Sequence, residues 1–321
     1  MHLLRMTMKD FCLPVSISNA LFQDIEDFPA QSPVDLHIHS NWSSDGEYGC
    51  LELFAAAKIL GMSHLVVADH DTMSHIPGAL EAGKLFNIRT MPALELSTVD
   101  ENRMVHVLAY GFDQTKDSTL KNMIDQVAKS RWDIFFKIAG RLREESFYFE
   151  DEKVLELAGG KPPVITNFAQ AILEDERNNN NKALHPYRPG GKKADVPNIR
   201  FINDYLVPGK KCNVPEYQIT LADGISAIHD SGGTAIIAHP GQWFVKKDEL
   251  KLKDLISRGL AGFEVYTPYH NSEKTTYFKE LCERFDLIGT GGSDFHSLSR
   301  KPGHHLGQSE GVTTAVFDRL L

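Results

Sequence analysis

The sequence has few cysteines, no long apolar run and no excess of basic residues, and each of these absences excludes a class of protein. No stretch is long and apolar enough to span a membrane, and residues 1–22 lack the sustained apolar core and small-residue cleavage site of a signal peptide. The four cysteines are far apart and form no C-x-x-C pair: Cys12, Cys50, Cys212 and Cys282. This spacing excludes a zinc knuckle and a disulfide framework. We therefore expect a soluble cytoplasmic protein without a membrane partner.

The charge balance is acidic, with 34 Lys and Arg residues against 43 Asp and Glu residues and a formal net charge of -9. Nonspecific binding to duplex nucleic acid depends on basic side chains that neutralise phosphates, so we expect no duplex partner. The apolar fraction of 42% and the charged fraction of 24% are those of an ordinary globular protein. Composition leaves the oligomeric state open.

Short apolar runs alternate with helical patterns over much of the chain, which is typical of successive βα units. Between several of these runs, apolar residues recur at three- and four-residue spacing, as in crossover helices. Right-handed crossovers of this kind predict an α/β fold with a parallel sheet or barrel. The predicted strands are residues 34–39, 63–69, 89–97, 104–112, 233–239, 261–267 and 286–292.

The alternation lapses between about Asp113 and Thr220, where residues 121–145 and 168–176 predict helices instead. Within this span we expect residues 176–193 to form an exposed loop, with the run from Asn178 to Asn181 as a disordered linker. We interpret the whole span as a mainly helical insertion. The predicted parts of the chain are an N-terminal extension at 1–32, a first barrel segment at 33–113, the insertion at 114–220 and a second barrel segment at 221–321.

Histidines and carboxylates recur at the ends of the predicted strands. His37 and His39 are two apart and therefore project to the same face of the first strand. Asp294 and His296 repeat this spacing after the glycine-rich GTGGS turn. Residues of the same types lie at or just beyond other strands: Asp45, His70, Glu95, His106 and His239. Because strand ends converge on one site in parallel α/β folds, these side chains together predict a polynuclear metal centre.

The chemistry of this set points to phosphate esters. Imidazoles and carboxylates without a thiolate suit Zn, Mn or Fe(II) and disfavour copper(I) or an iron–sulfur cluster. Clustered dications position a phosphate, lower the pKa of a bound water and stabilise the leaving oxygen, and phosphate ester hydrolysis needs all three effects. We therefore expect hydrolysis of a phosphate ester by metal-bound hydroxide.

Six segments resemble the successive motifs of the PHP (polymerase and histidinol phosphatase) family: DLHIHSNWSSDG, VVADHDT, PALELST, VHVLAYGFD, AIIAHPG and GGSDFH. The resemblance runs from about Pro33 to Leu306. It implies a distorted seven-stranded (β/α) barrel with three divalent metal ions, in which Glu95 bridges. The implied ligand groups are His37, His39, Glu95 and Asp294; Asp45, His70 and His296; and Glu95, His106 and His239. The candidate catalytic residues are Asp45, His70, Glu95 and His296.

Within this family, the order of the motifs and the segment YLVPGKKCNVP resemble most closely the branch that hydrolyses nucleotide phosphates and short 5'-phosphorylated RNA. That branch tends to carry an Arg-x-His step at the start of an insertion helix, and residues 164–169 contain no arginine here. An arginine would bind phosphate through two hydrogen bonds. The residues considered as substitutes in substrate binding are Lys210, Lys211, His304 and His305, together with Arg188 and Arg200.

Two other functions stay open. The first is a histidinol-phosphate or other small-molecule phosphatase, which a panel of phosphorylated substrates would distinguish. The second is a noncatalytic binding module that metal ions stabilise, which would bind metal without turnover.

Several polar residues near the motifs have more than one interpretation. Asp69 and Asp71 flank His70 and either orient its ring or cap the following turn. The histidines outside the motifs are expected to be surface or packing residues: His64, His75, His185, His229 and His270.

Overall fold

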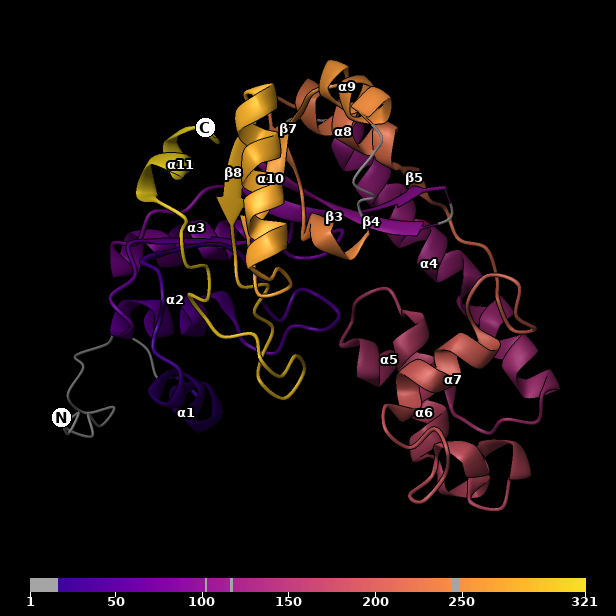
Figure 1. Cartoon of the computed structure of the whole chain (residues 1–321). Coiled ribbons are helices and arrows are strands. Elements are labelled where there is room, and N and C mark those ends of the chain that lie inside the picture. Colours follow the sequence, from indigo (N-terminus) through magenta and orange to yellow (C-terminus); the bar gives the residue numbers. More distant parts are fainter. Residues whose placement is uncertain (1–16, 102, 116–117, 244–248) are drawn as a thin grey trace. The chain divides into compact units, whose positions relative to one another are not determined.

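The computed structural model describes residues 17–101, 103–115, 118–243 and 249–321 (Figure 1). The chain forms two compact units, one made of residues 1–123 and 218–321 and the other of residues 124–217. Cys12 and the remainder of residues 1–16 in the predicted N-terminal extension lie outside the described residues. In the described part, none of the helices is long and apolar enough to cross a lipid bilayer.

The first unit is an α/β fold with two sheets. One sheet pairs β1 with β2 in parallel, and the other contains six strands in the order β5-β3-β4-β6-β7-β8. Each of the seven predicted strands overlaps an observed one, and the two-residue β5 was not predicted. The strands are β1 (Val34–Ile38), β2 (His64–Val67), β3 (Ala93–Asp100), β4 (Arg103–Tyr110), β5 (Ile219–Thr220), β6 (Thr234–Ile237), β7 (Leu260–Tyr266) and β8 (Ile288–Gly291).

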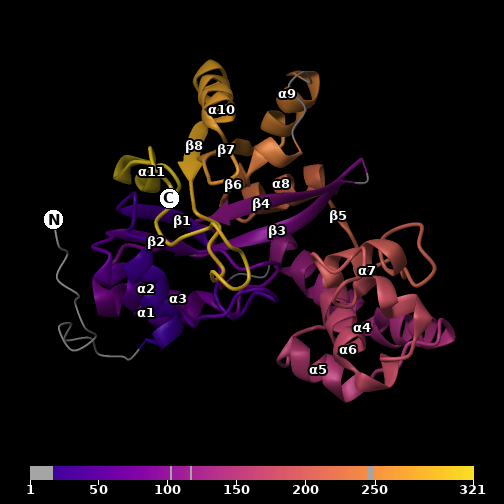
Figure 2. The same cartoon turned by 60° about the horizontal axis from the view of Figure 1, so that its bottom comes forward.

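The larger sheet is mixed, and the prediction of uniformly parallel strands is wrong for β4. This strand runs antiparallel to both of its neighbours, β3 and β6, whereas β6, β7 and β8 are parallel (Figure 2). The link from Asp100 to Arg103 is too short for a crossover helix, so β3 and β4 form a hairpin. As a result, His106 in β4 pairs with Ser97 in β3, two residues from Glu95.

Two isolated bridges connect the sheets. Ile38 at the end of β1 pairs with Phe295 beyond β8, and His70 beyond β2 pairs with Glu95 in β3. An apolar cluster that includes Leu36, Leu108 and Ile236 contains residues from both sheets. This packing fixes the strand ends from which most of the predicted metal ligands project.

Helices cover the strands of the first unit. Helices α2 and α3 pack with β1 and β2 around an apolar cluster that includes Phe54 and Leu65, and α1 packs on α2. Helix α8 packs on β3, β4 and β6, and α10 packs on β7 and β8. The helices are α1 (Asn19–Asp27), α2 (Cys50–Ile59), α3 (Ile76–Phe86), α8 (Leu221–Asp230), the 3-10 turn η4 (Pro240–Gln242), α9 (Glu249–Ser257), α10 (Ser272–Phe285) and α11 (Thr314–Asp318).

The second unit is helical in its described secondary structure and has an apolar core of its own, which includes Phe135, Phe168 and Phe201. Helix α4 starts within the residues of the first unit and continues into the second. The elements are α4 (Thr119–Glu144), α5 (Asp151–Ala158), α6 (Ile165–Glu174), η2 (Glu176–Asn178), η3 (Lys182–Tyr187) and α7 (Pro197–Tyr205).

The asparagine run in this unit is ordered, so the prediction of a disordered linker is wrong. The Asn178 side chain is fully buried; its amide accepts from the Tyr148 N–H at 3.0 Å and donates to the Tyr148 carbonyl at 2.7 Å and the Ile172 carbonyl at 2.8 Å. The Asn181 side chain accepts from the Ala183 N–H and caps η3. An amide both donates and accepts, so these side chains satisfy backbone groups that no regular element satisfies.

We expect the Asn178→Ala substitution to lower the free energy of unfolding by about 2 kcal/mol, because it leaves the buried Ile172 carbonyl and two partly buried backbone groups of Tyr148 without partners. The control is Asn180→Ala, an exposed residue of the same run, which should change the free energy by less than about 0.5 kcal/mol. Urea denaturation of the full chain measures both, and equal stability of the two variants would contradict the role assigned to Asn178.

Candidate metal centre

The nine predicted metal ligands lie in the first unit, and eight of them form three groups whose ligand atoms are within 4.8 Å of one another. His239 joins them because its Nε2 lies 3.1 Å from Glu95 Oε1. The resemblance implies three groups in which His39 and His70 each belong to one group. In the structure each of these two histidines belongs to two groups. The groups are His39, Asp45, His70 and His296; His37, His39, Glu95 and Asp294; and His70, Glu95 and His106.

Glu95 lies at the centre of this cluster and is fully buried on β3. Its two carboxylate oxygens face two different sets of imidazole nitrogens. From Oε2 the distances are 3.2 Å to His37, 3.1 Å to His39 and 3.1 Å to His70, and from Oε1 they are 2.8 Å to His106 and 3.1 Å to His239. A carboxylate placed in this way has the geometry of a bridging ligand.

Several buried atoms that face the cluster lack hydrogen-bond partners. They are Glu95 Oε2, Asp294 Oδ1, His70 Nδ1 and His106 Nδ1. Buried polar atoms without partners are costly and uncommon in folded proteins. Imidazole nitrogens and carboxylate oxygens are the ligand atoms of many divalent metal sites, so the donor set fits divalent metal ions.

Two histidines have their ring orientation fixed by hydrogen bonds from the nitrogen that faces away from the cluster. His37 Nδ1 donates to Glu264 Oε1 at 3.0 Å, and His296 Nδ1 donates to the Asp294 carbonyl at 2.9 Å. Each bond leaves the Nε2 lone pair toward the cluster, as in histidines that bind metal. His296 Nε2 lies 3.2 Å from Asp45 Oδ2.

Glu264 is a buried carboxylate beside the cluster that the sequence analysis missed. It is fully buried on β7, and it also accepts a hydrogen bond from the His239 backbone N–H at 2.8 Å. The sequence does contain a sign of this residue, because Glu264 is the single carboxylate in the otherwise apolar run AGFEVY, and a buried charge needs a partner. Gly292 makes room for this pair, because a Cβ there would lie 2.2 Å from His37 Cβ and 2.9 Å from Glu264 Oε1.

The backbone is strained at two of the predicted ligands. His239 has φ of 30° and Asp294 has φ of 51°, in the left-handed region that residues with a side chain rarely adopt. Strain of this kind persists where the surrounding structure imposes it, and it occurs often at functional sites.

Asp69 and Asp71, which flank His70, each accept hydrogen bonds from another segment of the chain. Asp69 accepts from the Ser40 N–H and hydroxyl and lies 3.8 Å from His39 Nδ1 and 3.2 Å from His75 Nδ1. Asp71 accepts from the Ser97 N–H in β3 at 2.7 Å. His75, expected to be a surface or packing residue, has a fully buried side chain whose Nε2 lies 3.1 Å from the Val67 and Ala93 carbonyls.

The electrostatics of the cluster reflect its mixture of buried charges. Burial opposes ionisation of Glu95, but the positive charges of neighbouring histidines, His106 first among them, outweigh burial and hold the pKa of Glu95 well below its usual value. Burial lowers the pKa of His70 to about 4, which keeps this imidazole neutral at pH 7. For His39, burial favours the neutral ring, but Asp294 and Glu95 outweigh it and raise its pKa to about 9.

Two of the predicted substrate-binding residues lie in the first unit. His304 is buried; its Nδ1 donates to the Ser293 carbonyl at 2.7 Å and its ring lies 4.7 Å from that of Tyr269. His305 stacks on Phe28 with ring centroids 3.6 Å apart. His304 is therefore close to the cluster through Tyr269, whereas His305 has a packing contact with the N-terminal region.

The remaining candidates belong to the second unit. Lys210 is exposed, and the ammonium of Lys211 lies 3.0 Å from Glu145. Arg200 pairs with Asp195, and Arg188 donates to the Leu173 carbonyl. Roles for these residues in substrate binding stay predictions.

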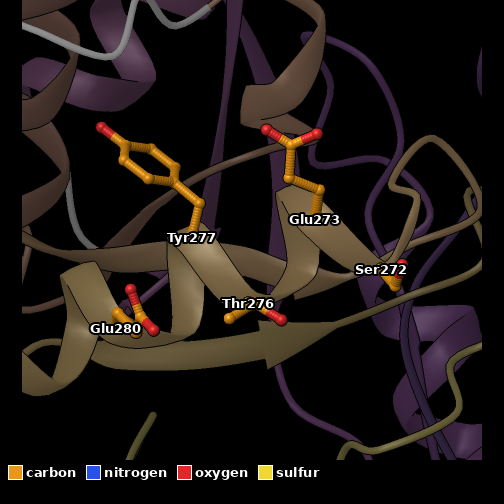
Figure 3. Close-up of a pocket in the computed structure, with 5 residues that line it drawn as sticks. All are labelled: Ser272, Glu273, Thr276, Tyr277 and Glu280. Carbon is orange, nitrogen blue, oxygen red and sulfur yellow. The ribbon is translucent and has the colours of Figure 1, made fainter.

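A separate hollow lies on α10 and is lined by Ser272, Glu273, Thr276, Tyr277 and Glu280 (Figure 3). It contains two carboxylates but no histidine and none of the nine predicted ligands. It is therefore not part of the metal centre.

The chain is similar to several known proteins. The family model of the PHP domain matches residues 35–189. The chain is 28% identical over 279 residues to a phosphoribosyl 1,2-cyclic phosphate 1,2-diphosphodiesterase of Eggerthella lenta, covering 84% of this chain and 96% of that protein. It is 30% identical over 268 residues to a 5'-3' exoribonuclease of Haemophilus influenzae, covering 82% of this chain and 89% of the relative.

The fold is also found among solved structures. A protein of Bifidobacterium adolescentis, provisionally described as a metal-dependent phosphoesterase, superposes with a TM-score of 0.73 at 22% identity, covering 91% of this chain and 96% of that one. At this identity the likeness shows the fold alone. The family match, the relative at 30% identity and the shared fold agree, and the chain belongs to the PHP domain family.

Proposed function

We propose that this chain is a metal-dependent phosphoesterase that hydrolyses phosphomonoesters of nucleotides or of short 5'-phosphorylated oligonucleotides. The observation that carries the proposal is the buried Glu95 carboxylate with histidine nitrogens on both of its oxygens. Divalent metal ions bound there would supply the positive charge that activates water and stabilises the phosphate in the transition state.

The proposed centre would hold three divalent ions, Mn, Zn or Fe, and Glu95 would be a ligand of two of them. This number and these identities come from the family resemblance and from the donor set. The proposed catalytic residues are Asp45, His70, Glu95 and His296. The proposed metal ligands are His37, His39, Asp45, His70, Glu95, His106, His239, Asp294 and His296.

The other residues of the site hold the ligands in place. Glu264 fixes the ring of His37 and the backbone of His239, which are ligands from β1 and from the end of β6. Tyr269 donates to Asp294 Oδ2 at 2.7 Å, so that Oδ1 faces the cluster. Because the site is preorganised in this way, little rearrangement is needed when a phosphate binds.

The proposed substrate class is supported by the relatives. One is named for a cyclic phosphodiester of phosphoribose and the other for the removal of nucleotides from the 5' end of RNA. Both of these substrates are phosphodiesters of ribose, whereas a third relative, from Chromobacterium violaceum, is named a 3',5'-nucleoside bisphosphate phosphatase, whose substrate is a ribose phosphomonoester. The relatives therefore favour a nucleotide or oligonucleotide over histidinol phosphate for this chain. A noncatalytic binding module is disfavoured because all nine predicted ligand residues are present and eight of them fall into compact groups.

We also propose the finer architecture. The two bridges that link the sheets, Ile38–Phe295 and His70–Glu95, support a distorted barrel of the PHP type. The compact helical unit at residues 124–217 supports an insertion between the barrel segments, predicted at 114–220.

The first test is phosphate release from nucleoside 5'-monophosphates, 3',5'-bisphosphates and a 5'-phosphorylated trinucleotide, with Mn, Zn or Mg and a chelator control. We expect chelator-sensitive turnover, which Glu95→Gln and His239→Ala should lower by on the order of 100-fold because charge stabilisation at the phosphate is lost. The matched control is His229→Ala, an exposed histidine. Activity that survives when either variant has lost its metal would contradict the proposal.

A second prediction concerns Glu264. We expect Glu264→Gln to weaken metal binding by about 10- to 100-fold, because the amide no longer provides the charged acceptor that orients His37. Chelator competition and elemental analysis measure the effect. The control is Glu280→Gln, an exposed carboxylate on α10, and unchanged affinity in Glu264→Gln would exclude the orienting role.

A third prediction concerns pH. Because Asp294 and Glu95 raise the pKa of His39 to about 9, this ring is protonated near pH 7 without metal. Metal ions must displace this proton, so affinity should rise with pH between about 6 and about 9. Titration calorimetry in two buffers of different ionisation enthalpy measures the proton release, and its absence would contradict the assignment of His39 as a ligand.

A further inference from the structure

The proposed substrate is an anion, and the proposed ligands include the carboxylates of Asp45, Glu95 and Asp294. Binding a phosphate beside them is favoured by a cation at the edge of the cluster. Among the ion pairs formed by described residues, one joins a lysine or arginine to a predicted ligand, and it links Lys301 to Asp294. The sequence analysis did not consider this lysine.

The two carboxylate oxygens of Asp294 face different groups, because Oδ1 faces the cluster and Oδ2 contacts Lys301. Oδ1 lies 3.1 Å from His39 Nε2 and 3.5 Å from His37 Nε2, without a hydrogen-bond partner. Oδ2 accepts from the Tyr269 hydroxyl at 2.7 Å and from the Lys301 ammonium. The ammonium is therefore separated from the cluster by the width of one carboxylate group.

Other contacts hold Lys301 in this position. Its backbone N–H donates to the Ser297 carbonyl at 2.8 Å, and its ammonium lies 4.8 Å from the centroid of the Tyr269 ring. The Tyr269 ring packs on His304, which is anchored to the Ser293 carbonyl. The tyrosine therefore contacts both partners of the ion pair.

The Lys301 ammonium also has capacity to bind an anion. An ammonium has three N–H donors, and the Asp294 oxygen accepts one hydrogen bond from it. The side chain is 28% exposed, against 3% for Asp294, so the lysine is the member of the pair that solvent and substrate can reach.

We propose that Lys301, positioned by Tyr269 and Asp294, binds the phosphate group of the substrate and selects phosphomonoesters over phosphodiesters. This inference rests on the proposed function. A monoester phosphate carries close to two negative charges at neutral pH, whereas a diester carries one. A fixed cation beside the metal ions therefore stabilises the bound monoester more than the bound diester.

The test compares Lys301→Met and Lys301→Arg with the wild type on p-nitrophenyl phosphate and bis(p-nitrophenyl) phosphate, with metal content measured for each protein. For Lys301→Met we expect KM for the monoester to rise about 10- to 100-fold and KM for the diester to change less than about threefold, because a charge-assisted hydrogen bond to the monoester is lost. Lys301→Arg should restore part of the preference, since it keeps the charge. The control is Arg300→Met, which removes the exposed neighbouring cation.

Equal losses on both substrates, or a loss of bound metal in proportion to activity, would mean that Lys301 only balances the charge of Asp294, and would overturn the inference. Calorimetry with inorganic phosphate and the metal-loaded proteins tests Lys301 independently of turnover. Phosphate binding that is at least about tenfold weaker in Lys301→Met supports the inference, and unchanged binding overturns it. If the wild type binds metal and phosphate but hydrolyses no ester, the proposed function fails while the phosphate site stands.

Discussion

The structure of the site depends on one interaction, the contact of the buried Glu95 carboxylate with imidazoles on both of its oxygens. A carboxylate that is fully buried is costly unless positive charge or hydrogen-bond donors surround it. Here Glu95 is surrounded by histidines from strands that are distant in sequence. The position of β3 between its neighbours, and the bridge from Glu95 to His70, are therefore requirements of the site as well as of the fold.

The order of the strands explains how these ligands meet. The short link from β3 to β4 makes a hairpin, which places His106 on the strand beside Glu95. The strands β6, β7 and β8 are parallel neighbours. His239 follows the end of β6, Glu264 lies in β7 and Asp294 follows the end of β8. Glu264 connects the first of these to β1 through His37, so one carboxylate joins three strands of the centre.

Much of this centre could be predicted from the sequence, because metal ligands leave a local signal. The period of two in His37–His39 and the placement of Glu95 in a short apolar run follow from strand geometry. Asp294 and His296 have the same spacing but lie beyond the end of β8, where Asp294 has a left-handed backbone. The structure brings these residues together as expected, while their binding of metal stays a proposal.

The supporting residues could not be predicted in this way. Lys301 looks like any loop lysine in the sequence, and only its position over a tyrosine ring and beside Asp294 distinguishes it. Likewise, a run of asparagines has the composition of a linker, and the burial of Asn178 depends on the backbone that folds around it. The roles of Lys301 and Asn178 depend on contacts with residues that are distant in the sequence, and amino-acid composition does not reveal such contacts.

The central claim is that the Glu95 carboxylate is shared by more than one metal ion. The most direct measurement is the number of metal ions bound per chain, determined by elemental analysis together with anomalous X-ray scattering, in the wild type and in Glu95→Gln. The account predicts several ions in the wild type and the loss of more than one of them in the variant, since each carboxylate oxygen faces its own set of histidines. A variant that keeps all of its ions, or a wild type that binds a single ion, would contradict it.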